Sequence, residues 1–194
     1  TRELASMIKE AGIHFTELPD DDFDDPMGES TGAGAIFGAT GGVIEATVRT
    51  AYETLTGKEL EKLEFTDLRG LTGIKETTVK IGDRDVRIAV ANGLGNTRKL
   101  LNKVKSGEEK FDAIEVMACP GGCIGGGGQP FHHGDISILR RRAEGIYSVD
   151  QNKKLRKSHE NPKIKELYET YLGEVAGPRA HELLHTSYEA KPKL

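Results

Sequence analysis

Residues 117–130 hold both cysteines of the chain within its densest run of glycine. The segment reads MACPGGCIGGGGQP, with three residues between Cys119 and Cys123. Cysteine thiolates bind iron and zinc, and glycine lets backbone N–H groups come close enough to a bulky group to hydrogen-bond it. The segment therefore predicts an inorganic cofactor held against the main chain.

Three kinds of chemistry are open to this pair of cysteines. A disulfide would leave the glycines unexplained, and a reducing compartment disfavours it. Zinc could use both cysteines with His132 and His133, although adjacent histidines rarely converge on one tetrahedral ion. An iron–sulfur site accounts for thiolates and glycines together, but an all-cysteine cluster needs about four thiolates. Because the chain has only two cysteines, we expect the other ligands to come from protein outside it.

Composition narrows the class of protein. The chain has 194 residues, 36% hydrophobic and 30% charged, which suits one domain with a substantial core, or one domain plus a small appendage. A net charge of -4 argues against nucleic acid as the main partner. No apolar run approaches the roughly 20 residues that span a bilayer, and no signal peptide is evident, so we expect a cytoplasmic location. Helical spacing begins directly after Thr1, which suggests a fragment of something larger.

Hydrophobic periodicity predicts an α/β domain with a mixed sheet flanked by helices across residues 1–150, and a small helical segment across 151–194. The cysteine segment directly follows the last predicted strand, and α/β folds commonly place ligands at the C-terminal ends of strands. The predicted helices cover 4–11, 43–55, 97–105, 136–146, 162–172 and 179–186, and the predicted strands cover 74–81, 86–90 and 111–117.

A second glycine-rich stretch, GESTGAGAIFGATGG at 28–42, leads into the predicted helix at 43–55. Its glycines at Gly32, Gly34 and Gly38 are one residue off the dinucleotide fingerprint. The acidic segment before them, residues 18–26, is a predicted loop where that fingerprint requires a strand. The stretch is better explained as one wall of the cofactor site, or as tight packing at a helix start.

Charged residues and histidines elsewhere have simpler explanations. The basic stretches at 140–142 and 153–157 predict solvated helix faces, with a landing site for an acidic electron carrier as the alternative. His181 and His185 are four residues apart, which would suit a metal, but such histidines are usually partly buried structural residues.

The cysteine segment resembles the third signature motif of the iron-only (FeFe) hydrogenases. Two further stretches agree with that family: DDPMGESTGAG at 24–34 and IFGATGGV at 36–43. SHENP at 158–162 and HELLHT at 181–186 resemble the family's small-subunit-like terminal segment. Together these motifs span nearly the whole chain.

The resemblance implies reversible reduction of protons to dihydrogen at a 4Fe-4S cubane bridged to a two-iron centre. It makes Cys119 a terminal ligand of the cubane and Cys123 the thiolate that bridges the cubane to the two-iron unit. It places Met117 and Phe37 beside that unit. The further residues that it places at the cofactor are Ala33, Gly34, Gly38, Gly122 and Gln129.

The chain departs from the family because two other signature motifs are absent. These motifs would supply the remaining cubane ligands, a proton-passing cysteine and a lysine that anchors a cyanide. We therefore expect an incomplete half-site that is inactive alone, with the remainder of the catalytic domain as its partner. The electron carrier would be ferredoxin or an NAD(P)-linked subunit. The alternatives are a protein like the iron–sulfur assembly factors related to nuclear prelamin A recognition factor, and a structural zinc module. The glycine loop that carries Phe37 and the HELLHT ending favour the hydrogenases over the assembly factors, and metal analysis would separate zinc from iron.

Overall fold

The structure is a computed structural model that describes residues 1–22, 24 and 28–190. Phe23, Asp25, Pro26 and Met27, which belong to the predicted acidic loop and to one of the motif stretches, lie outside the described residues. The longer elements are α1 (Arg2–Glu10), α2 (Gly32–Ile36), α3 (Gly42–Thr56), β1 (Ile74–Ile81), β2 (Arg84–Asn92), α4 (Leu94–Ser106), β3 (Ala113–Met117), α5 (Ile136–Asn152), α6 (Pro162–Leu167) and α7 (Pro178–Leu184).

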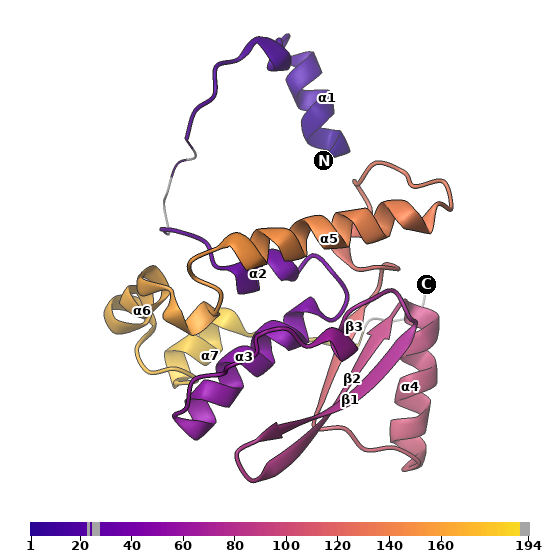
Figure 1. Cartoon of the computed structure of the whole chain (residues 1–194), viewed down its shortest axis with the longest axis vertical. Helices are drawn as coiled ribbons and strands as arrows, with labels where there is room; N and C mark the ends of the chain where they lie inside the picture. Colours follow the sequence, from indigo (N-terminus) through magenta and orange to yellow (C-terminus); the bar gives the residue numbers. More distant parts are fainter. Residues whose placement is uncertain (23, 25–27, 191–194) are drawn as a thin grey trace.

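A three-stranded mixed sheet lies between two helices (Figure 1). Strand β1 runs antiparallel to β2, and β3 runs parallel to β2 on its other side. Side chains alternate along β2, so that Ile88 and Val90 pack on α3 while Ala89 and Ala91 pack against Leu100 of α4. The predicted α/β class with a mixed sheet is confirmed.

Helix α5 adds a further layer, because it lies across α2 (Figure 1). Here Ala33, Ile36 and Ala46 form a small core with Tyr147 of α5. Helix α6 follows the short helical turn at Ser158–Glu160, and this turn contacts α3. Asn161 caps the start of α6, since its side chain accepts a hydrogen bond from the Lys163 N–H at 2.9 Å.

A buried cluster of charges joins these layers. Arg49 of α3 is fully buried and bonds Glu45 at 2.7 Å and Asp150 of α5 at 2.8 Å. Arg69 and Arg156 reach the same two carboxylates from loops at 2.6 and 2.7 Å. Burial alone would raise the pKa of Asp150, but the hydrogen bonds from the two arginines outweigh it and lower that pKa. The carboxylate of Asp150 therefore stays charged, and both buried carboxylates are paired with arginines.

The largest differences from the predictions concern three elements, while the other predicted helices and strands differ at their ends at most. The predicted helix at 136–146 extends to Asn152, and the one at 162–172 becomes α6 followed by a π-helical turn at Tyr168–Leu172. The short helix α2, inside the second glycine-rich stretch, was not predicted, because glycine is a poor helix former. Thr31 starts α2 by accepting the Gly34 N–H at 3.2 Å.

Helix α1 stands away from the body of the molecule (Figure 1). None of its residues is buried, and its leucine and methionine, Leu4 and Met7, are 60% and 63% exposed. It touches the rest of the chain near the end of the cysteine segment, where the Arg2 N–H donates to Gly128 O at 2.8 Å and the Arg2 guanidinium lies over the Phe131 ring. Among the described residues, no helix has the length and apolar character needed to cross a bilayer.

Candidate metal centre

Both cysteines lie just beyond the C-terminal end of β3, as the sequence predicted. Because β2 and β3 are parallel, their C-terminal ends meet at the same edge of the sheet. Cys119 is half-buried and Cys123 is exposed, and both are free thiols. Their sulfur atoms are therefore available to a ligand at this edge.

The two glycine-rich stretches pack against each other backbone to backbone. The Thr40 N–H donates to Gly121 O, and the Ile124 N–H donates to Gly38 O, each at 3.1 Å. A Cβ at Gly122 would lie 2.7 Å from Gly38 O, and Gly122 has a φ of +94°. Glycine is thus required at position 122 by the contact between the loops.

Most backbone N–H groups of the cysteine loop are used within the protein. The Gly121 N–H donates to Asn92 Oδ1 at 2.8 Å, and the Gly122 N–H donates to Cys119 O at 3.0 Å. The three N–H groups of residues 124–126 donate to other backbone carbonyls. The expectation that the glycine N–H groups face a cofactor is therefore wrong for these positions. Between 121 and 126, all of which the structure describes, the Cys123 N–H is the one without a partner.

Gly126 lies beside the sulfur atom of Cys119. A Cβ at Gly126 would lie 3.5 Å from Cys119 Sγ, whereas one at Gly127 would meet open space. The backbone therefore adds no side chain next to the Cys119 sulfur.

The other predicted site residues have different surroundings. Phe37, which follows α2, is 45% exposed, whereas Met117 is half-buried at the end of β3. Ala33 is fully buried in the small core under α5, and Gly34 is exposed. Gln129 accepts a hydrogen bond from Thr1 Oγ1 at 3.0 Å, which ties α1 to the end of the cysteine segment.

Polar side chains that the sequence interpretation missed hold the second glycine-rich stretch in place. Glu115 of β3 accepts the N–H groups of Gly41 and Ile44 at 2.5 and 2.9 Å. Lys75 of β1 donates to Thr40 O and Gly70 O at 3.2 and 2.8 Å. Burial lowers the pKa of Lys75 to about 8, against the opposing effect of Glu115. Each residue continues an inward-facing alternation of its strand, which is a signal that the sequence does contain.

The basic stretches are less solvated than predicted. Arg142 donates to Ile124 O and Pro130 O, both at 2.7 Å, and so braces the cysteine loop at both ends of its glycine run. Arg156 belongs to the buried charge cluster, and Lys157 pairs with Glu53 at 2.8 Å. Arg140 and Arg141 do remain exposed.

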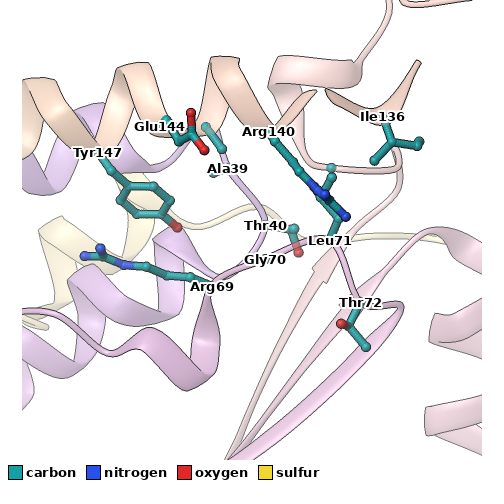
Figure 2. A pocket seen from close by; sticks show the side chains of 12 residues that line it. Ala39, Thr40, Arg69, Gly70, Leu71, Thr72, Ile136, Arg140, Glu144 and Tyr147 are labelled. Carbon is teal, nitrogen blue, oxygen red and sulfur yellow. The ribbon is translucent and has the colours of Figure 1, made fainter. Parts of the chain in front are cut away.

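A cavity of about 680 Å³ lies behind the loops, walled by Thr40, Gly121, the 69–72 segment and α5 (Figure 2). The hydroxyls of Thr40 and Tyr147 are buried at this cavity, and no group in the described part of the chain hydrogen-bonds them. Burial, with Glu45 nearby, raises the pKa of Tyr147, so its hydroxyl stays neutral.

The residues of the predicted zinc alternative do not converge on one site. Within the described ranges, the one group of three or more metal-type side chains with converging ligand atoms is Glu53, His159 and Glu160. The ammonium of Lys157 bonds both carboxylates of that group at 2.8 Å. The cysteines do not form a four-ligand group with the histidines at 132 and 133.

The prediction for the C-terminal histidines is wrong. His181 and His185 are exposed rather than partly buried, and their Nδ1 atoms lie 2.5 Å apart.

Fold and site together define an α/β domain that presents a two-cysteine, glycine-lined loop at the edge of its sheet. The family profile described as "Iron only hydrogenase large subunit, C-terminal domain" matches residues 1–127, and "Iron hydrogenase small subunit" matches 136–191. The chain belongs to the iron-only hydrogenase family. The second match begins at the first residue of α5 and leaves residues 128–135 between the two, whereas the division at residue 150 stays a prediction.

Individual proteins similar to this chain support the same family assignment. The chain is 58% identical over its whole length to the NADP-reducing hydrogenase subunit HndD of Solidesulfovibrio fructosivorans, and 46% identical over 97% of its length to Iron hydrogenase 1 of Clostridium pasteurianum. An apo FeFe-hydrogenase structure from Chlamydomonas reinhardtii, 45% identical, superposes on 96% of the chain with a TM-score of 0.74. A mouse cytosolic iron-sulfur assembly component is 32% identical over the full chain.

The chain spans 33% and 34% of the two curated hydrogenases and 53% of the Chlamydomonas chain. It therefore corresponds to part of a larger protein in each of these relatives.

Proposed function

We propose that this chain forms one side of the hydrogen-activating centre of an FeFe hydrogenase. The observation that carries the proposal is the loop at the sheet edge, which presents two free thiols in a protein of this family. Cys119 would be a terminal ligand of a 4Fe-4S cubane, and Cys123 would bridge the cubane to a two-iron centre. When bound, this cofactor supplies the reversible two-electron reduction of two protons to dihydrogen.

The residues fit such a group. Soft thiolates are the ligands that iron–sulfur clusters take. The half-buried Cys119 and the exposed Cys123 give the group one inner and one outer anchor. Gly126 adds no side chain beside Cys119 Sγ, and the uncommitted Cys123 N–H can donate to a cluster sulfur.

The remaining residues would shape the surroundings of the cofactor. Phe37 and Met117 are apolar and lie next to the two loops, so that they would exclude water from the reacting centre. Gly34 and Gly38 add no side chains to the second glycine-rich stretch. Gly122 lets that stretch approach the cysteine loop closely. Gln129, bound to Thr1, would fix the far end of the loop.

The partner that completes the site would be the remainder of the catalytic domain. Apolar side chains beside the site are exposed here, including Phe37 at 45%, Phe131 at 66% and the leucine and methionine of α1. Such a surface is typical of an interface between parts of one domain. Electrons would pass through ferredoxin or an NAD(P)-linked subunit, and the relative named as NADP-reducing supports the latter. A cytoplasmic location stays a prediction from the sequence.

The test is to express the longer protein that contains this chain, mature it without dioxygen, and measure dihydrogen evolution. We expect activity in the wild type, and loss of at least about a thousandfold for Cys123→Ser, because a hydroxyl is a poor ligand for iron. Val149→Ser, on the exposed side of α5, is the matched control and should keep full activity. Undiminished turnover by Cys123→Ser would contradict the bridging role.

The isolated 194-residue chain should evolve no dihydrogen, because it supplies two of the four cubane ligands. Hydrogen evolution by the purified chain would disprove the half-site.

An assembly-factor role is the second candidate, supported by the 32% identity to the mouse assembly component. The 58% identity to a hydrogenase subunit favours the first. Infrared absorption separates them, since carbonyl and cyanide ligands of a two-iron centre absorb where protein does not. A matured protein with an iron–sulfur cluster but without these bands would favour assembly.

A further inference from the structure

Each strand of the sheet contributes one buried polar side chain to the loops of the site. Lys75 of β1, Asn92 of β2 and Glu115 of β3 are 8%, 6% and 7% exposed. Lys75 and Glu115 both pair with Val90 in the register, and Asn92 follows two residues later, so all three side chains project from the same face. That face carries α3 and the second glycine-rich stretch.

Asn92 is the one of the three that contacts the cysteine loop directly. Its Oδ1 accepts the Gly121 N–H at 2.8 Å, and its Nδ2 donates to Leu71 O at 3.2 Å. Its backbone N–H donates to Gly73 O at 2.7 Å. The amide oxygen, the amide nitrogen and the backbone N–H of Asn92 are therefore all hydrogen-bonded. These bonds fix the position of the side chain that binds the cysteine loop.

Gly121 lies midway between the two cysteines, two residues from each. The Thr40 N–H donates to Gly121 O, so the peptide groups on either side of this residue are fixed from opposite directions, by Asn92 and by the glycine-rich stretch. Glu115 holds that stretch in turn, through the N–H groups of Gly41 and Ile44. The spacing of the two sulfur atoms thus depends on a chain of hydrogen bonds that begins at Asn92.

We propose that Asn92 is a positioning residue that sets the placement of the Cys119 and Cys123 thiolates; this rests on the proposed function of the loop. It contacts neither sulfur and acts through the Gly121 peptide. A neutral amide suits this position, because it donates and accepts without adding charge close to the ligands.

The test compares Asn92→Leu, which is similar in size but cannot hydrogen-bond, with Asn92→Asp, which can still accept the Gly121 N–H. Asn102→Leu, exposed on α4, is the matched control. The first readout is hydrogen–deuterium exchange of the peptide spanning 118–123 in the longer protein before maturation. We expect Asn92→Leu to exchange at least about tenfold faster there, since the Gly121 N–H loses its acceptor, and Asn92→Asp to stay protected.

The second readout is the midpoint potential and electron paramagnetic resonance spectrum of the cubane after maturation. Asn92→Leu should change the spectrum. Asn92→Asp should retain the wild-type spectrum and shift the potential in the negative direction, because a nearby carboxylate disfavours the added electron. Unchanged exchange and an unchanged spectrum in Asn92→Leu would overturn the proposal. Faster exchange with an unchanged spectrum would also overturn it, by reducing Asn92 to a structural role.

If Asn92→Leu does not fold, hydrogen–deuterium exchange of Asn92→Asp still tests the proposal. Loss of Gly121 protection in that variant would count against the proposal. Absence of any cluster in the matured wild type would refute the proposed function, while the exchange measurement would still show whether Asn92 holds the loop.

Discussion

Gly122 lies at the contact between the two loops of the site, and its substitution should be costly. In Gly122→Ala the new Cβ would lie 2.7 Å from Gly38 O and 2.8 Å from the Thr40 nitrogen, at a φ of +94°. We expect the free energy of unfolding to fall by about 2 kcal/mol or more, from strain and separation of the loops. Denaturant titration measures this change.

Gly145→Ala is the matched control for that substitution. Gly145 lies within α5, where an added Cβ would meet nothing within 4 Å. Alanine there should raise the free energy of unfolding by about 0.5–1 kcal/mol, because glycine is unfavourable inside a helix. If the two alanine variants had equal stabilities, the packing explanation for Gly122 would be wrong.

Lys75 should give the protein a specific dependence of stability on alkaline pH. Its pKa is lowered to about 8 in the folded state from 10.5. Between these values the unfolded chain binds more protons than the folded chain, so stability rises with pH. Below pH 8 both states are protonated, and the cost of burying the charge is fully present.

The measurement is the difference in unfolding free energy between wild type and Lys75→Met, followed from pH 7 to 11. We expect the wild type to gain on the variant across pH 8 to 10.5, by up to about 3 kcal/mol. The difference cancels the titration of other lysines. A pH-independent difference would show that the lysine is not desolvated in the folded protein.

The same residues show what the sequence could and could not predict. The cysteine loop was predicted at a strand end because its motif is local and the strand before it is apolar. Asn92 and Lys75 were not assigned, although Asn92 continues the alternation of Val86, Ile88 and Val90 toward α3. Asparagine and lysine are mostly exposed in folded proteins, and only the loops that fold over these two positions make them buried.

At the scale of elements, Arg49 is the residue that holds α3, α5 and the segment after α5 together. Arg49→Met would leave the carboxylates of Glu45 and Asp150 buried with fewer cations. We expect a loss of about 3–5 kcal/mol in unfolding free energy. The control is Arg98→Met on α4, an exposed arginine, which should change stability by less than about 0.5 kcal/mol.

Thermal or denaturant unfolding of both variants makes this comparison. Similar stabilities for the two would mean that the buried arginine is not needed to pair the acids. The cluster was beyond sequence reasoning because its members lie far apart in the chain: 101 residues separate Arg49 from Asp150. The glycine-rich stretch was predicted as a site wall, but helix α2 within it depends on packing beneath α5, which overrides the low helix propensity of glycine.

At the scale of the whole molecule, α1 exposes an apolar face that this chain leaves uncovered. Leu4 and Met7 lie one turn apart on the same side of α1 and are 60% and 63% exposed. In water such a face favours self-association. In the longer protein proposed above, the remainder of the catalytic domain would cover the same face.

Substitution of Leu4 and Met7 by serine should therefore improve the behaviour of the isolated chain but destabilise the longer protein. In the isolated chain, Leu4→Ser with Met7→Ser should raise the monomer fraction in sedimentation, because less apolar surface is exposed. In the longer protein the same pair should lower the unfolding free energy by about 2–4 kcal/mol, since two buried apolar side chains are lost. Val149→Ser on the outer side of α5 should do neither. Equal, small effects in both contexts would mean that α1 does not contact the rest of the domain.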